Sequence, residues 1–248
     1  IAQLNLHTAA FHAGDLAAAE RHLLHAREGA ASWDLPALGR LAGMLLANLR
    51  LHQGDLDAAG AYVRGLPERW EDLLDWHDRG CAWTFVGHYH TAKGEWPEAE
   101  RALARARTVF ERAEFAEGLK LPLERELWLA VRRGQPARAL ALAAGLDVGA
   151  ARSVYDLQLA LPVVRARLAR GERAEARALL DAVEPELAAL GAGLLAARAG
   201  LYRAWAAGTP VPDLEAGGWG FLRAEDPELW AALAPAPAAA RHPLPAGA

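Results

Sequence analysis

The chain has 248 residues, a formal net charge of -4 and 53% hydrophobic residues, so it can bury one large or two small hydrophobic cores. One Ile, ten Val and five Thr are too few β-branched residues to fill the strands of a sheet, which indicates an all-α protein. A single Cys excludes a disulfide scaffold and a Cys-rich zinc site, and the mild acidity gives no basic surface for direct nucleic-acid binding.

No run of residues is apolar and long enough for a membrane span. The longest candidate, residues 187–197, ends at Arg198. We therefore expect no membrane partner and a cytoplasmic location. Because helical patterning begins directly after Ile1, we also expect a fragment of a longer polypeptide or a processed product.

A turn signal recurs along the chain with a period of 40 residues, and later of 37. It consists of a Gly, an acidic or amide residue directly after it, and an Ala five residues after the Gly. The glycines are Gly14, Gly54, Gly94, Gly134 and Gly171, the alanines are Ala19, Ala59, Ala99, Ala139 and Ala176, and a further step of 37 residues leads to Gly208.

Each signal predicts a helical hairpin. The Gly can take the left-handed conformation that ends a helix, and the acidic residue after it can cap the next helix. The small Ala allows the two helices to cross closely. Since one hairpin cannot bury its own apolar face, the hairpins are expected to stack.

The third unit carries the fullest pattern. Its residues are Trp83, Val86, Gly87 and His90 before the turn, then Gly94, Ala99, Leu103 and Ala106. The pattern resembles the tetratricopeptide repeat, although the period exceeds that family's usual length of about 34 residues. Units of this longer type are similar to those in the C-terminal arrays of large bacterial transcription activators.

The resemblance implies a right-handed superhelical solenoid of stacked antiparallel helix pairs, with about five repeats and a capping helix over residues 1–207. The first helices of the pairs would line a concave groove. The last of them is expected over residues 187–207. Residues 208–248 are expected to form a C-terminal cap segment, with one short helix from Asp226 to Leu233 and a Pro/Ala-rich tail.

The family's register assigns groove positions by counting back from each turn glycine. The polar and aromatic residues placed there are Asn48, His52, His88, Glu124, Trp128, Arg132, Gln158, Arg165, Arg198 and Tyr202, with Thr8, His12 and Thr84. Three of the arginines recur at intervals of 33 residues and favour a carboxylate or phosphate partner, unless they only supply solvated charge. Met44, Phe85 and Leu121 stand where the family's carboxylate clamp has polar residues, so that peptide class is not expected.

Catalytic and metal motifs are missing. The chain has no Gly-x-Ser-x-Gly, no Gly-rich phosphate loop and no His-Glu-x2-His, and its histidine pairs have no third ligand at a known spacing. We therefore expect no enzyme, no metal and no cofactor. The first hypothesis is a scaffold that binds an acidic protein or peptide in its groove, and the alternative is an effector-sensing and oligomerisation module of a bacterial transcriptional regulator.

Overall fold

The computed structural model describes residues 2–64, 75–149, 153–209, 211 and 226–233. These ranges contain helices and turns and no strand, which confirms the all-α prediction. Within them, every helix is too short or too polar to cross a bilayer.

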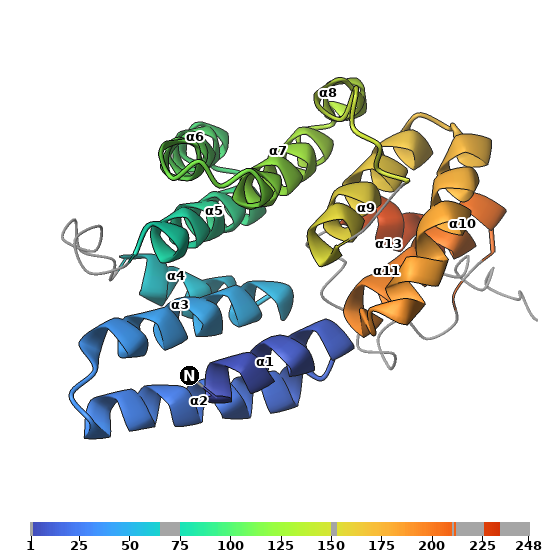
Figure 1. Cartoon of the computed structure of the whole chain (residues 1–248). Coiled ribbons are helices and arrows are strands. Elements are labelled where there is room, and N and C mark those ends of the chain that lie inside the picture. Colours follow the sequence, from blue (N-terminus) through green and yellow to red (C-terminus); the bar gives the residue numbers. More distant parts are fainter. Residues whose placement is uncertain (1, 65–74, 150–152, 210, 212–225, 234–248) are drawn as a thin grey trace, which may run out of the picture.

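The helices pack against their neighbours in chain order. They are α1 (Ala2–Ala13), α2 (Leu16–Ser32), α3 (Pro36–His52), α4 (Leu56–Arg64), α5 (Trp76–Lys93), α6 (Trp96–Arg112), the 3-10 turn η2 (Glu117–Leu119), α7 (Lys120–Arg132), α8 (Pro136–Leu142), α9 (Val154–Ala169), α10 (Arg173–Ala189), α11 (Gly193–Ala207) and α13 (Pro227–Leu233). The odd-numbered helices from α1 to α11 surround the centre of the molecule, and α2, α6, α8 and α10 lie outside them (Figure 1).

The turn glycines behave as the repeated signal predicts. All six have a positive φ, at Gly14 (88°), Gly54 (78°), Gly94 (75°), Gly134 (68°), Gly171 (76°) and Gly208 (70°). The five alanines that follow the turns have no exposed surface, as close packing of the helices requires. The left-handed helix ends are thus confirmed.

The predicted helix caps form only where the residue after the Gly is Asp. The side chains of Asp15 and Asp55 accept hydrogen bonds from the backbone N–H groups of Ala18 and Ala58, the third residue of the next helix in each case, at 2.8 and 3.0 Å. Glu95, Gln135 and Glu172 make no cap hydrogen bond. The longer glutamates instead pair with basic residues just before the turn; Glu95, for example, lies 2.5 Å from the Lys93 ammonium.

The start of the last inner helix differs from the prediction. Helix α10 continues to Ala189, and α11 begins at Gly193 rather than at Leu187. Gly191, with a φ of 60°, ends α10 in the left-handed conformation, which separates two helices that the sequence pattern merges.

The two ends of the helical array meet. Helix α11 packs against α1, and its lower end lies beside the end of α1 in Figure 1. At Gly193 a Cβ would overlap the carbonyl oxygen of Ala13, and at Gly14 a Cβ would lie 3.5 Å from the backbone nitrogen of Leu194. Because backbone cannot swing aside as a side chain does, the close approach requires glycine at position 193. The array therefore closes on itself.

The short C-terminal helix α13 joins the core of the last inner helices. Leu229 and Leu233 have no exposed surface and pack in one cluster with Tyr202. Asp226 caps the helix by accepting a hydrogen bond from the N–H of Leu229 at 3.1 Å, which confirms the predicted helix. The predicted Pro/Ala-rich tail lies outside the described residues.

A buried ion pair fastens α13 to α9. Arg165, 3% exposed, donates from Nε and Nη2 to the two carboxylate oxygens of Asp226 at 2.7 and 2.9 Å. Its Nη2 also lies 2.8 Å from Glu228, and its guanidinium lies 4.7 Å from the centre of the Trp205 ring. Two carboxylates and one aromatic face thus compensate the burial of this charge.

We expect Gly94→Val to lower the free energy of unfolding by about 1 to 3 kcal/mol, because a β-branched residue is strained at a φ of 75°. Gly200→Ala is the matched control: no atom lies within 4 Å of its added Cβ in the middle of α11, and we expect it to stabilise by roughly 0.5 to 1 kcal/mol. Urea denaturation measures both. An unchanged stability of Gly94→Val would contradict the role of the left-handed turn.

For the buried ion pair, we expect Asp226→Asn to destabilise by about 3 kcal/mol, since it leaves Arg165 buried with a weaker partner while an amide oxygen still caps α13. Glu228→Gln is the control on the same guanidinium. The Glu228 side chain is 63% exposed, so its loss should cost less than about 1 kcal/mol. Equal losses of unfolding free energy for Asp226→Asn and Glu228→Gln in urea denaturation would contradict the role of the buried Arg165–Asp226 pair in holding α13 against α9.

Candidate functional site

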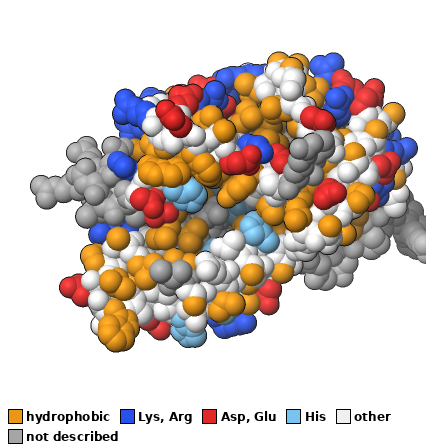
Figure 2. Space-filling view, viewed as in Figure 1, with side chains coloured by type: hydrophobic (Ala, Val, Ile, Leu, Met, Phe, Trp, Pro, Cys, Tyr) orange, Lys and Arg blue, Asp and Glu red, His pale blue; other side chains and the backbone are white. Residues whose placement is uncertain are grey.

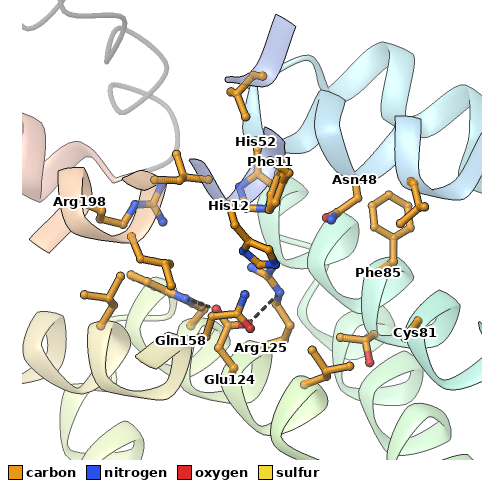
Figure 3. A pocket seen from close by; sticks show the side chains of 18 of the residues that line it. Phe11, His12, Asn48, His52, Cys81, Phe85, Glu124, Arg125, Gln158 and Arg198 are labelled. Atoms are coloured by element: carbon orange, nitrogen blue, oxygen red, sulfur yellow. Dashed lines mark hydrogen bonds and ion pairs between the residues drawn. The ribbon is translucent and has the colours of Figure 1, made fainter. Parts of the chain in front are cut away.

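The inner helices enclose a cavity of about 220 Å³, which we call the central chamber. Each odd-numbered helix from α1 to α11 contributes to its wall. The polar, sulfur-containing and aromatic residues of the wall are Phe11, His12, Met44, Asn48, His52, Cys81, Thr84, Phe85, Glu124, Arg125, Trp128, Gln158 and Arg198. Figure 3 shows the chamber from close by. In the space-filling view of Figure 2, histidine and hydrophobic side chains gather around the centre of the molecule.

A second cavity of about 520 Å³ adjoins the chamber and shares Arg125, Trp128 and Arg198 with it. We call it the arginine pocket. Its other charged and polar residues are His88, Thr91, Lys93, Arg132, Arg133, Arg165, Tyr202, Asp226 and Glu228. The C-terminal helix α13 thus forms part of its wall.

All ten predicted site residues line one of the two cavities. Asn48, His52, Glu124, Trp128, Gln158 and Arg198 line the chamber, and His88, Trp128, Arg132, Arg165, Arg198 and Tyr202 line the arginine pocket. Thr8 lines neither and donates to the carbonyl of Leu4 within its own helix. The register places these side chains together because the inner helices turn equivalent faces to one centre.

The prediction omits the apolar part of the wall and one cation. Phe11 on α1 and Leu194 and Leu195 on α11 line the chamber, as does Arg125 on α7. Met44, Phe85 and Leu121 fill positions where the family's clamp is polar. The register places Met44, Phe85 and Leu121 at the same helix faces as the predicted polar residues, which is the signal in the sequence for this apolar part of the wall.

One carboxylate organises the polar side of the chamber. Glu124, 8% exposed, accepts a hydrogen bond from Trp128 Nε1 at 2.7 Å and pairs with Arg125 Nε at 2.9 Å. The guanidinium of Arg198 lies 5.6 Å from the centre of the Trp128 ring. The carboxylate and the indole therefore hold two guanidinium groups beside one cavity (Figure 3).

The histidines of this region are held neutral. The rings of His52 and His88 lie 5.4 Å apart, and Phe11 lies 5.0 Å from His52. Burial lowers the pKa of both imidazoles well below 6.5, and the nearby Arg125 and Arg198 lower it further. Burial also lowers the pKa of His12. Near pH 7 the guanidinium groups thus carry the positive charge of the site and the imidazoles carry none.

One group of side chains in the described part of the chain has metal-ligand geometry. Ligand atoms of Asp75, His77 and Asp78 lie within 4.8 Å of one another at the start of α5. Hydrogen bonds to Asp78 and then to Cys81 raise the pKa of His77 to about 10. A protonated imidazole cannot ligate a metal, and Asp75 already caps α5, so we assign no ion to this group.

Comparison of the chain with protein-family models, with curated proteins and with solved structures finds no match. The function of the chain is therefore inferred from the geometry of the two cavities.

The neutral histidines make a pH dependence testable. Their folded-state pKa is depressed, so below pH 6.5 the unfolded chain takes up protons that the folded chain does not. Stability is then complete above about pH 6.5 and falls toward acid pH, by up to about 1.4 kcal/mol per pH unit for each histidine. We expect His52→Gln to reduce this slope in urea denaturation between about pH 7 and about pH 5.

The matched control is His25→Gln, on an exposed position of α2 that lines neither cavity. It should keep the wild-type slope. If His52→Gln also keeps it, His52 is charged in the folded protein and the assignment of a neutral wall is wrong.

Proposed function

We propose that the chain is a non-enzymatic ligand-binding module of tetratricopeptide type, built as a right-handed superhelical array, and that it holds a small effector in the central chamber. The observation that carries the proposal is the packing of α1 against α11, since it encloses the space that an open array would expose as a groove. The recurring left-handed glycines and fully buried alanines support the repeat assignment.

The dimensions favour a small molecule over a folded partner. A chamber of about 220 Å³ takes a compact molecule, and the adjoining pocket of about 520 Å³ lies within the usual range of small-molecule sites. The wall combines apolar side chains with a few placed polar groups, of which Asn48, Glu124 and Gln158 come from three different helices. This is the composition expected of a site that recognises one ligand.

Bacterial transcription activators with repeat units of similar length suggest effector sensing as the role of the chamber. In that role, a ligand in the chamber would stabilise the closed array. A ligand that touches Phe11 on α1 and Arg198 on α11 contacts both helices in the closed array and loses the contacts to one of them if the array opens. Such a difference in affinity between two states is what a ligand-driven switch requires.

A short acidic peptide is the second candidate. Lys93 and Arg133 flank the turn glycines Gly94 and Gly134 on the wall of the arginine pocket, so a peptide carboxylate entering among these turns would meet basic side chains. The scaffold hypothesis is retained in this narrower form.

The test is a fragment screen by saturation-transfer NMR on the wild-type chain and on Asn48→Trp, which fills the chamber. We expect the binding fragments to compete with one another and to be lost in the variant. Asn5→Trp places the same substitution on an exposed position of α1 and should bind as the wild type does. Circular dichroism and melting curves establish that both variants are folded. Fragments that bind Asn48→Trp as well as the wild type would refute the chamber as the binding site.

A further inference from the structure

The charged side chains of the central chamber already have partners within the protein. Three of them line it, Glu124 and Arg125 on α7 and Arg198 on α11. Glu124 pairs with Arg125 at 2.9 Å and accepts a hydrogen bond from Trp128 Nε1. Arg198 lies over the Trp128 ring and makes at least one further interaction within the chain. A charged ligand therefore finds no uncommitted group of opposite charge among the described residues of this wall.

Entry of an ion into the chamber is for that reason unfavourable. An ion that leaves water loses its hydration, and only an opposite charge or several hydrogen bonds offset that loss. His12 and His52 on the same wall add no charge near pH 7, because burial lowers the pKa of both imidazoles below the ordinary value of 6.5. The electrostatics of the chamber thus favour a molecule without net charge.

Two neutral amides of the wall are uncommitted. Asn48 on α3 and Gln158 on α9 line the chamber, and neither side chain hydrogen-bonds to another described residue. Both are partly exposed, so a molecule in the cavity can reach them, and Figure 3 shows that they approach it from different helices. Each amide offers N–H donors and a carbonyl acceptor. A ligand with one donor next to one acceptor satisfies groups of this kind.

The rest of the wall is largely apolar. Phe11 and Phe85 contribute rings from α1 and α5, and Leu121, Leu161 and Leu194 contribute aliphatic side chains from α7, α9 and α11. An apolar cavity of about 150 Å³ is large enough to hold benzene. The chamber, at about 220 Å³, therefore has room for one ring with a small polar substituent.

We infer that the ligand of the central chamber is an uncharged aromatic or cyclic amide, whose ring contacts the apolar wall around Phe11 and Phe85 and whose amide group hydrogen-bonds to Asn48 and Gln158. The inference rests on the proposed function and names the chemical class of the effector. It differs from the acidic partner that the recurring arginines favour in the sequence, because Arg165 and Arg198 have partners inside the protein.

The test compares benzamide, benzoate and benzylamine, which share a ring and are neutral, anionic and cationic near pH 7. Isothermal titration calorimetry on the full chain should give benzamide an affinity about ten-fold higher than that of either ion, because neither ion recovers its lost hydration in the chamber. Toluene, which has no polar group, measures binding to the apolar wall alone.

Two substitutions remove the amides and keep the approximate size of the side chains. Gln158→Met and Asn48→Leu should each weaken benzamide about five-fold, the effect of one hydrogen bond, and leave toluene binding unchanged. Unchanged toluene binding also establishes that the chamber is intact in each variant. Gln135→Met is the matched control, since Gln135 lies between α7 and α8 and lines neither cavity. It should bind benzamide as the wild type does.

The inference is overturned if benzoate or benzylamine binds as tightly as benzamide, or if benzamide fails to bind at millimolar concentration. Full benzamide affinity in either Gln158→Met or Asn48→Leu would also overturn it, as would a loss of toluene binding in these variants. These results are separate from the proposed function. If an ion binds best and is lost in Asn48→Trp, the chamber remains the ligand site and only the class of the ligand is wrong. Benzamide binding to Asn48→Trp at the wild-type affinity would refute both.

Discussion

The contact of α11 with α1 at Gly193 is the constraint on which the central chamber depends. A side chain there would overlap the carbonyl oxygen of Ala13, and since the obstacle is backbone, the two helices would have to separate. With α1 and α11 apart, Phe11 and Leu194 would no longer face one cavity, and the inner layer would become the wall of an open groove. The lack of a side chain at position 193 therefore allows α1 and α11 to line one cavity.

The inner helices also supply partners for the arginines that lie between them. Each of three inner arginines has its own carboxylate or aromatic face: Arg125 has Glu124, Arg165 has Asp226, and Arg198 has the ring of Trp128. These contacts hold the guanidinium groups in fixed directions before any ligand arrives. The nearby imidazoles respond to the same field by remaining neutral, because a further cation would meet both burial and repulsion. The three guanidinium groups are thus oriented by contacts within the protein itself.

The sequence pattern predicts the local features and fails on contacts between distant segments. A glycine followed by Asp is enough to locate a left-handed helix end and a cap, because both depend on neighbouring residues. The repeat register groups the ten site residues, because equivalent helix faces point to one centre. It cannot predict the pair of Arg165 with Asp226, which are 61 residues apart, or the close approach of Gly193 to Ala13. Those contacts depend on how far the whole array curves, which is the sum of small rotations at every helix crossing.

The same geometry connects the two cavities to both ends of the helical array. The chamber wall includes α1 and α11, and the arginine pocket reaches α13 through Arg165 and Asp226. A ligand that fits only the closed array therefore adds its binding free energy to the closing contact, by about 2.7 kcal/mol at a concentration one hundred times its dissociation constant. Under the proposed function, a bound ligand therefore favours the closed array over an open one.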